Sequence, residues 1–151
     1  MNKILIVDDD NYKTSNIVQL LNKMNIEPEI TIEKALNPGL RKICQENFDI
    51  VILDMSMPIF DLSESSNFNS FGGITFLEEM KRKKISIPTI IVTQYQIFGE
   101  GSSQKTSDSI DKMCQENFQN YKGLIIYSSL ESNWKEKLVK IIGESKKWSM
   151  F

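Results

Sequence analysis

Histidine is absent from this chain of 151 residues. Its absence excludes Ser-His-Asp and Cys-His nucleophile activation and every metal site that needs an imidazole ligand. Any chemistry must therefore use carboxylates, hydroxyls, amines or backbone groups. Cysteine is scarce as well: Cys44 and Cys114 are too few for a disulfide framework and lack metal-ligand spacing. Both lie in helical patterns, where we expect small buried side chains.

Long apolar runs and a charge excess are also missing. No run approaches the ~20 apolar residues of a membrane span, and the apolar stretch near the N-terminus stops at Asp8, too early for a signal peptide. Lys plus Arg number 18 against 20 for Asp plus Glu, a net charge of −2 that suits neither nucleic acid nor an anionic membrane. We therefore expect a cytoplasmic protein that binds neither nucleic acid nor membrane.

Short apolar runs rich in β-branched residues punctuate the sequence. Four of them are continuous, which is typical of strands buried on both faces of a parallel sheet. A fifth run alternates polar and apolar residues, which predicts an edge strand. The continuous runs are Ile4–Val7, Ile50–Leu53, Thr89–Val92 and Leu124–Tyr127, and the alternating run is Glu29–Ile32.

Helical patterns separate these runs. The second helix offers Asn37 as its N-cap and Pro38 as its first residue, and runs towards Asn47 with Cys44 facing inward. The other helices are marked by apolar residues at helical spacing within 17–24, 74–80, 110–118 and 134–142. Five strand–helix units, joined by right-handed crossovers, predict an α/β fold: a doubly wound three-layer sandwich.

Acidic side chains follow two strands that are neighbours in such a sheet. Asp8–Asp10 follow the first strand and Asp54 follows the third. Clustered carboxylates raise one another's pKa unless a cation relieves them, and Mg²⁺ suits an all-oxygen set of ligands. Taken alone, an acidic run after a strand more often forms a turn and caps the next helix. Thr93 adds a hydroxyl at the end of the fourth strand, on the same edge of the sheet.

Several segments, in order along the chain, resemble the receiver domain of bacterial two-component response regulators. They are Ile4–Asp10, Val51–Pro58 with its Asp-Met-Ser-Met-Pro sequence, Gly72-Gly73 opening a helix, and Ile90–Thr93. The resemblance covers nearly the whole chain. It implies a single receiver-like domain over residues 1–151, with a flavodoxin-like, five-stranded parallel sheet of strand order 2-1-3-4-5. It also implies a signalling phosphoprotein rather than an enzyme.

The resemblance implies a role for each site residue. Asp8 and Asp9 position Mg²⁺, with Asp9 as the direct ligand. Asp54 accepts the phosphoryl group and also ligates the metal, whose site the backbone carbonyl of Ser56 completes. Thr93 hydrogen-bonds the phosphoryl oxygens and reports their presence. Because the chain has no histidine, the phosphoryl group must come from another protein, a histidine kinase or a phosphotransfer protein.

The fifth strand departs from the family's pattern. The family carries a Lys-Pro pair at its end, with the lysine paired to the phosphoryl group, whereas this chain has Tyr127 and Ser128. Tyr127 can offer a neutral hydrogen bond, which is weaker than a charge-assisted one. Lys122 precedes the strand and therefore lies at the opposite edge of the sheet. Lys105, in the loop after the fourth strand, reaches the site only if that loop folds over it.

Two stretches near the expected site are longer than the family's loops or rich in turn residues. Ile59–Phe71 is a Ser/Asn-rich insert that contains three phenylalanines, and Phe98–Ser109 is rich in Gly and Ser. Each follows a strand and so lies on the edge where open α/β sheets bind ligands. A solvated loop is the default interpretation of the insert, and a lid or docking surface is the alternative.

Two functional hypotheses follow. The first is a stand-alone receiver domain that is phosphorylated on Asp54 in a Mg²⁺-dependent reaction and signals through contact with a downstream protein. The alternative is a pseudo-receiver, a protein-binding module in which phosphotransfer is lost or weak, because Tyr127 stands at the family's lysine position. A Mg²⁺-dependent phosphohydrolase is disfavoured, since Ser56 stands where a second acid or base is needed.

Overall fold

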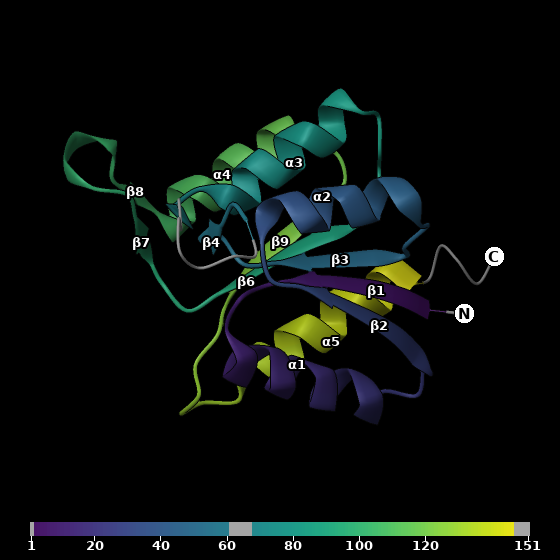
Figure 1. Cartoon of the computed structure of the whole chain (residues 1–151). Coiled ribbons are helices and arrows are strands. Elements are labelled where there is room, and N and C mark those ends of the chain that lie inside the picture. The colour runs from purple at the N-terminus through teal and green to yellow at the C-terminus, as the bar shows by residue number, and fades with distance from the viewer. Residues whose placement is uncertain (1, 61–67, 147–151) are drawn as a thin grey trace.

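The central sheet has five parallel strands in the order β2-β1-β3-β6-β9 (Figure 1). The computed structural model describes residues 2–60 and 68–146. The predicted α/β fold and strand order are confirmed, and β2 lies at one edge as its alternating pattern indicates. The strands are β1 (Asn2–Val7), β2 (Pro28–Glu33), β3 (Ile50–Leu53), β6 (Thr89–Thr93) and β9 (Tyr121–Ile126).

Helices cover both faces of the sheet. In Figure 1, α1 and α5 lie below the sheet and α2, α3 and α4 lie above it. None of the helices in the described residues is long and apolar enough to cross a membrane. The helices are α1 (Asn11–Lys23), α2 (Leu36–Gln45), α3 (Gly72–Arg82), α4 (Ser107–Asn117) and α5 (Asn133–Lys146).

Alternation along the strands divides the core into two apolar layers. Ile4 and Ile6 of β1 pack in the layer that contains the inward residues of α1 and α5. Leu5 and Val7 pack in the layer against α2, α3 and α4. All four side chains are fully buried, as expected for a strand covered on both faces. The same alternation determines which layer of helices the side chain after each strand faces.

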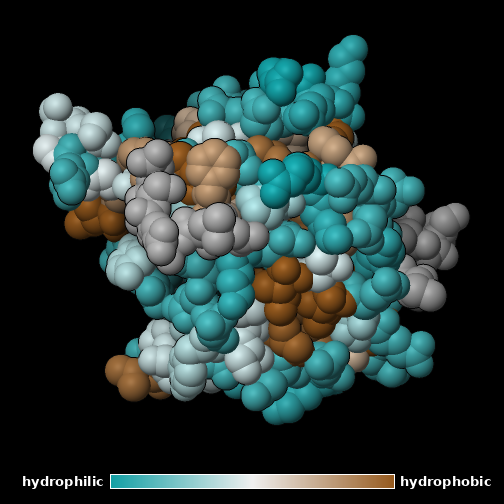
Figure 2. Space-filling view, in the orientation of Figure 1, coloured by the Kyte–Doolittle hydropathy of each residue, from teal (hydrophilic) through white to brown (hydrophobic). Residues whose placement is uncertain are grey.

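Apolar side chains also reach the surface in a few places. Ile32 on the edge strand β2 is 41% exposed, and Figure 2 shows a hydrophobic patch in the middle of the view, at the β2 edge of the sheet. Ile97 is 56% exposed, and the same view shows a second hydrophobic patch at its left. Most of the remaining surface in this view is hydrophilic, so these patches stand out as local features.

The start of α2 differs from the prediction. The helix begins at Leu36, so Asn37 and Pro38 lie inside its first turn, and its N-cap is Ala35, which offers no side-chain hydrogen bond. Tertiary contacts fix this start instead: the Asn37 N–H donates to the carbonyl of Ile59, 3.0 Å away. Proline is tolerated there because the first-turn N–H groups have no partner inside the helix.

Each turn-rich stretch has a short antiparallel strand pair at its ends that the sequence pattern does not predict. Around the insert, β4 (Met57–Pro58) pairs with β5 (Phe68–Asn69), and residues 61–67 lie outside the described residues. After β6, β7 (Ile97–Phe98) pairs with β8 (Lys105–Thr106) in a hairpin that projects from the body of the molecule (Figure 1).

Two other sequence predictions need correction. Cys44 is exposed rather than inward, whereas Cys114 is fully buried as expected. The sequence pattern predicts the last strand over Leu124–Tyr127, but β9 is Tyr121–Ile126, and Tyr121 is already paired with Thr89 of β6. Tyr127 therefore follows the strand, although its N–H still donates to the Thr93 carbonyl at 2.8 Å.

Candidate functional site

The site begins where β1 and β3 end. Asp8 and Asp54 are both buried, and the Asp54 N–H donates to the Val7 carbonyl at 3.0 Å, which extends the pairing of the two strands. Side chains alternate between the two faces of a strand, so both carboxylates are on the face that is covered by α1 and α5. One carboxylate oxygen each from Asp8, Asp9 and Asp54 lies within 4.8 Å of the others. The predicted cluster is therefore present.

The residues of the acidic run Asp8–Asp10 have different contacts. Asp10 is the N-cap of α1, and its Oδ1 accepts the N–H groups of Tyr12 and Lys13 at 3.0 and 3.1 Å. Asp8 Oδ1 accepts the N–H of Asp10 at 2.9 Å, which holds the turn between β1 and the helix. The capping interpretation is thus confirmed for Asp10, whereas Asp8 and Asp9 belong to the carboxylate cluster.

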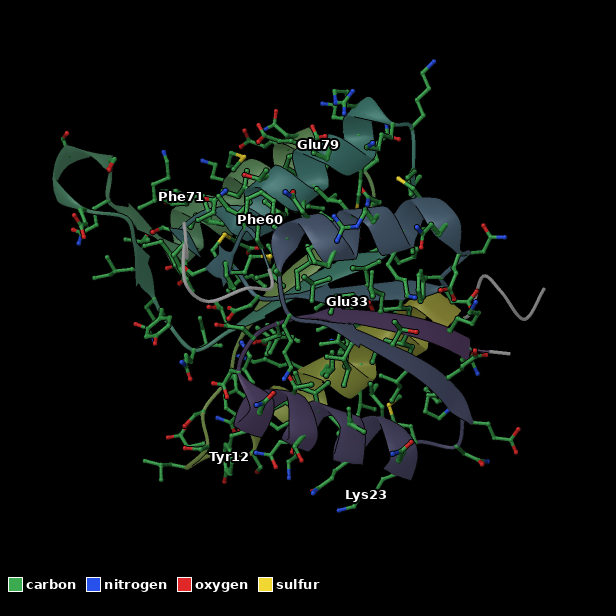
Figure 3. The ribbon with its side chains drawn as sticks, in the orientation of Figure 1. Tyr12, Lys23, Glu33, Phe60, Phe71 and Glu79 are labelled. Atoms are coloured by element: carbon green, nitrogen blue, oxygen red, sulfur yellow. The ribbon has the colours of Figure 1, made fainter. Side chains whose placement is uncertain are left out.

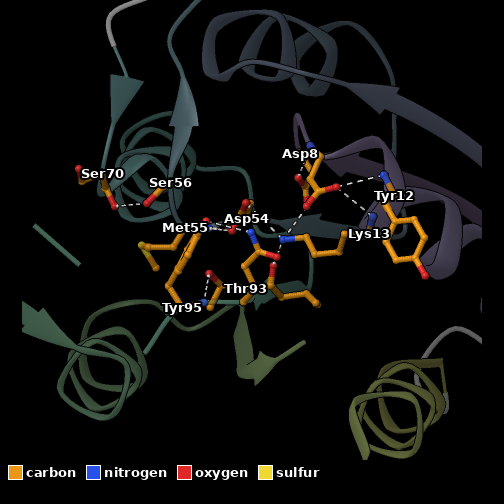
Figure 4. A network of polar contacts seen from close by, with 12 residues as sticks. Asp8, Tyr12, Lys13, Asp54, Met55, Ser56, Ser70, Thr93 and Tyr95 are labelled. Atoms are coloured by element: carbon orange, nitrogen blue, oxygen red, sulfur yellow. Dashed lines mark hydrogen bonds and ion pairs between the residues drawn. The ribbon is translucent and has the colours of Figure 1, made fainter. Parts of the chain in front are cut away.

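A lysine that sequence reasoning missed lies among these carboxylates. Lys13, in the first turn of α1, is fully buried. Its Nζ lies 2.8 Å from Asp8 Oδ2 and 3.2 Å from Asp54 Oδ2, and it donates to the Val92 carbonyl at 2.9 Å (Figure 4). The signal was available in the sequence: Lys13 precedes Ile17 and Leu21 at helical spacing, which places a lysine on the apolar stripe of α1.

The electrostatics follow from this burial. Burial is the largest cause that raises the pKa of Asp8 to about 6, with Lys13 opposing the shift and Asp54 adding to it. Burial also raises the pKa of Asp9, together with the negative charges of Asp54 and Asp10. Burial disfavours the charged form of Lys13, but Asp54 and Asp8 outweigh it and raise the lysine's pKa. The cluster is a crowded group of negative charges with one buried partner cation.

The loop after Asp54 is held by a close approach of α3. The Met55 N–H donates to Asp54 Oδ1 at 2.7 Å, and the Gly73 N–H donates to the Met55 carbonyl at 2.8 Å. A Cβ at Gly73 would lie 2.9 Å from the Asp54 carbonyl oxygen, and one at Gly72 would lie 2.6 Å from Met57 Cγ. The two glycines therefore let the N-terminus of α3 pack directly on the residues that follow β3.

Ser56 and Thr93 flank the carboxylates. The Ser56 hydroxyl donates to the Ser70 carbonyl at 3.0 Å and so joins the loop after β3 to the far side of the insert (Figure 4). Thr93 is fully buried at the end of β6, and its Oγ1 accepts a long hydrogen bond of 3.5 Å from the Tyr95 N–H. The hydroxyl thus lies at the start of the loop that leads to the β7–β8 hairpin.

Tyr127 has its own set of contacts at the end of β9. Its hydroxyl accepts a hydrogen bond from the Asn16 amide at 2.7 Å, and its ring lies 5.0 Å from the Trp134 ring, centre to centre. Both partners belong to the α1/α5 side of the sheet, where Tyr127 is buried. The side chain at the family's lysine position therefore joins α1 to α5 through packing and one neutral hydrogen bond.

The remaining sequence candidates lie further away. Lys105 is exposed on β8, in the projecting hairpin. In the insert, Phe60 is 51% exposed and Phe68 is 54% exposed, whereas Phe71 packs against the core and lies against Gly99 of the hairpin (Figure 3). One of the three phenylalanines thus anchors the insert, and the two others are available at the surface.

Comparison with known proteins gives a consistent answer. The family model for the response regulator receiver domain matches residues 4–117. The Detocs response regulatory protein DtcB of Enterobacter cloacae is 31% identical over an alignment of 151 positions that covers 94% of this chain and 99% of that protein.

Solved structures show the same fold. A response regulator receiver domain protein from Clostridium thermocellum has a TM-score of 0.66 at 21% identity and covers 99% of this chain and 98% of its own. The response regulator TrrA of Thermotoga maritima, in complex with Mg²⁺-BeF, has a TM-score of 0.58 at 21% identity. The match covers 93% of this chain and 99% of TrrA. With the family model spanning most of the strands and helices above, this chain belongs to the response regulator receiver domain family, whose members are signalling domains rather than conventional enzymes.

Proposed function

We propose that this chain accepts a phosphoryl group on Asp54 in a Mg²⁺-dependent reaction and passes the signal on through a protein contact. The observation that carries the proposal is the convergence of Asp8, Asp9 and Asp54, whose carboxylate oxygens lie within 4.8 Å of one another at the carboxyl edge of the sheet. This edge is where open α/β sheets bind ligands.

The residues fit a magnesium ion. The carboxylates of Asp8, Asp9 and Asp54 offer only oxygen ligands, which hard divalent cations prefer. In this proposal the backbone carbonyl of Ser56 adds a further oxygen ligand. The raised pKa of Asp8, caused mainly by burial, marks a group whose charge lacks sufficient compensation. Bound Mg²⁺ supplies charge neutralisation for phosphoryl transfer. We assign Asp8 and Asp9 to positioning it, with Asp9 as the direct ligand.

Asp54 is the nucleophile in this proposal. The Met55 N–H orients the buried carboxylate of Asp54 by donating to Oδ1, and the other oxygen, Oδ2, faces the Lys13 ammonium. An oxygen of Asp54 attacks phosphorus as the bond to the donor's leaving group breaks, and that group departs with the bonding electrons. Thr93, at the start of the next loop, then hydrogen-bonds the phosphoryl oxygens and reports their presence.

Intact-mass measurement tests this function. Incubation with Mg²⁺ and a small phosphodonor is expected to add the mass of one phosphoryl group, and EDTA is expected to prevent the addition. Asp54→Asn is the matched variant, because it keeps the shape of the side chain and removes the nucleophile. Equal labelling of Asp54→Asn contradicts the proposal. Rapid hydrolysis is checked with beryllofluoride, and a chain that shows neither an adduct nor beryllofluoride binding also contradicts it.

The partners follow from the family. Receiver domains are phosphorylated by histidine kinases or phosphotransfer proteins, and we propose a donor of this kind for Asp54. Similarity over nearly the full length of a Detocs response regulatory protein supports a regulator of that type. Exposed Tyr95 and Ile97, which follow Thr93 in the chain, offer an apolar surface for a downstream protein.

A pseudo-receiver is the second candidate, and one observation favours it. Tyr127 stands at the family's lysine position and contacts Asn16 and Trp134, so the end of β9 brings no charge to the site. A pseudo-receiver binds its partner constitutively. Pull-down of the downstream partner by unphosphorylated chain and by Asp54→Asn with equal affinity therefore favours this second candidate over the first.

A further inference from the structure

The faces of the strands identify the helix that can supply a cation to the site. Asp8 continues the row of Ile4 and Ile6, and Asp54 continues the row of Ile50 and Ile52, all of which face the α1/α5 layer. A cation that meets both carboxylates must come from that layer or from a strand end beside it. The first turn of α1 is the nearest such element, because it follows Asp8 directly.

The pattern of α1 sends one lysine into this layer. Lys13, Ile17 and Leu21 recur every four residues and are all fully buried. Asp10 caps the helix and accepts the N–H of Lys13 itself at 3.1 Å, which fixes where the side chain begins. A buried lysine is costly unless it is paired, and the apolar stripe offers it no alternative position in solvent.

Contacts with three different strands hold the Lys13 ammonium. It pairs with Asp8 after β1 at 2.8 Å and with Asp54 after β3 at 3.2 Å, and it donates to the Val92 carbonyl of β6 at 2.9 Å (Figure 4). An ammonium has three hydrogen-bond donors, and each has a partner here. The group is therefore fixed beside the Oδ2 atom of Asp54.

Two other lysines are less suited to this position. Lys105 is exposed on the projecting hairpin. Lys122 lies near the start of β9, and because the strands are parallel this is the edge opposite to Asp54. At the end of β9 itself, Tyr127 contacts Asn16 and Trp134.

We propose that Lys13 of α1 supplies the fixed cation of the phosphoryl site, in the role that the family's pattern gives to a lysine after the fifth strand. The inference rests on the proposed phosphoacceptor function of Asp54. As an Asp54 oxygen bonds to phosphorus and the donor's leaving group departs with its electron pair, Lys13 stays protonated. It exchanges its contact with Asp54 for one with a phosphoryl oxygen. Its fixed charge stabilises the negative charge on those oxygens.

This role has a signature that a merely structural lysine lacks. The ammonium competes with a divalent cation for the same carboxylates, so its removal strengthens Mg²⁺ binding while it weakens phosphoryl transfer. For Lys13→Met, we expect Mg²⁺ affinity to rise about tenfold from the loss of a repelling charge. We expect the rate of phosphorylation at saturating Mg²⁺ to fall on the order of a hundredfold. The two effects have opposite signs.

The experiment uses the full chain with Mg²⁺ and a small phosphodonor, read by intact mass, and a separate Mg²⁺ titration read by the thermal unfolding midpoint. Lys13→Gln is the second uncharged variant, and it is expected to lose the rate as Lys13→Met does. Lys23→Met removes one exposed charge from the same helix, and Lys105→Met removes the rival lysine. Both controls are expected to leave the rate and the Mg²⁺ affinity unchanged.

The outcomes separate this inference from the function beneath it. If the wild-type chain is labelled on Asp54 and the uncharged Lys13 variants are labelled as fast, Lys13 has no part in the transfer. A loss of rate in Lys105→Met instead assigns the cation to the hairpin and overturns the inference. If the wild-type chain itself neither accepts a phosphoryl group nor binds beryllofluoride, the proposed function fails and the role of Lys13 fails with it.

Discussion

Two places along the carboxyl edge of the sheet bury different kinds of side chain. Where β1 and β3 end, Asp8 and Asp54 are buried together and share the ammonium of Lys13, 2.8 and 3.2 Å away. Where β9 ends, Tyr127 is buried against Trp134 and accepts one hydrogen bond from Asn16. Both ends face the α1/α5 layer, and α1 provides the partner in each case.

The difference shows what each kind of burial requires. Buried carboxylates need a compensating charge and precise partners, so their surroundings cannot change without cost. A buried tyrosine needs only apolar contact and a partner for its hydroxyl. Because Lys13 meets the electrostatic requirement from α1, the residue after β9 is free to act as an apolar link between α1 and α5.

Lys13→Met is expected to have the largest effect on stability, at the ends of β1 and β3. This change leaves Asp8 and Asp54 buried without their shared cation, so we expect the free energy of unfolding in EDTA to fall by about 3–5 kcal/mol. Urea denaturation measures the loss, and Mg²⁺ is expected to restore part of it by neutralising the same carboxylates. Lys23→Met, at the exposed end of α1, is the control and is expected to change stability by less than about 0.5 kcal/mol. An equally small loss in Lys13→Met contradicts the electrostatic account.

The protonation of Asp8 sharpens the same comparison. Burial raises the pKa of Asp8 from 3.8 to about 6, so the folded chain binds this proton more tightly than the unfolded chain. The stabilising contribution is complete below the unfolded pKa of 3.8 and is lost as the pH rises to about 6. Urea denaturation in EDTA across this range, as the difference between wild type and Asp8→Asn, isolates it. A difference that does not vary with pH removes Asp8 as the cause.

At the aromatic end, Tyr127→Phe is expected to have the smallest effect. It keeps the contact with Trp134 and removes the hydroxyl that accepts from Asn16 at 2.7 Å, which costs about 1 kcal/mol. A double-mutant cycle with Asn16→Ala measures the coupling of the pair. The rate of Asp54 phosphorylation is expected to stay unchanged. A large loss of that rate would show that the tyrosine hydroxyl serves the site after all.

The sequence predicted most of the sheet because buried parallel strands leave a direct pattern. Ile50–Leu53 was predicted with the bounds of β3, and the carboxylates after β1 and β3 were expected to converge, as they do. Parallel strands bring their carboxyl ends to one edge, so position along the chain was sufficient to place these groups together.

Contacts between segments that are far apart in the sequence could not be predicted from the strand pattern. Lys13 was missed because a lysine at a helix start is usually solvated, and only the facing carboxylates make its burial favourable. The start of α2 was misplaced because a hydrogen bond from Asn37 to Ile59 fixes it rather than a capping side chain. The short β4–β5 and β7–β8 pairs have two residues per strand, too few for any periodicity to mark them.

The position of Lys13 also bears on how the chain is made. Asp8 and Lys13 lie five residues apart in the sequence, and Asp54 and Thr93 follow before β9 begins at Tyr121. Synthesis proceeds from the N-terminus, and a nascent chain gains its interactions in that order. The counter-charge therefore leaves the ribosome before the carboxylate of Asp54, and these acidic groups need not await the last strand for neutralisation.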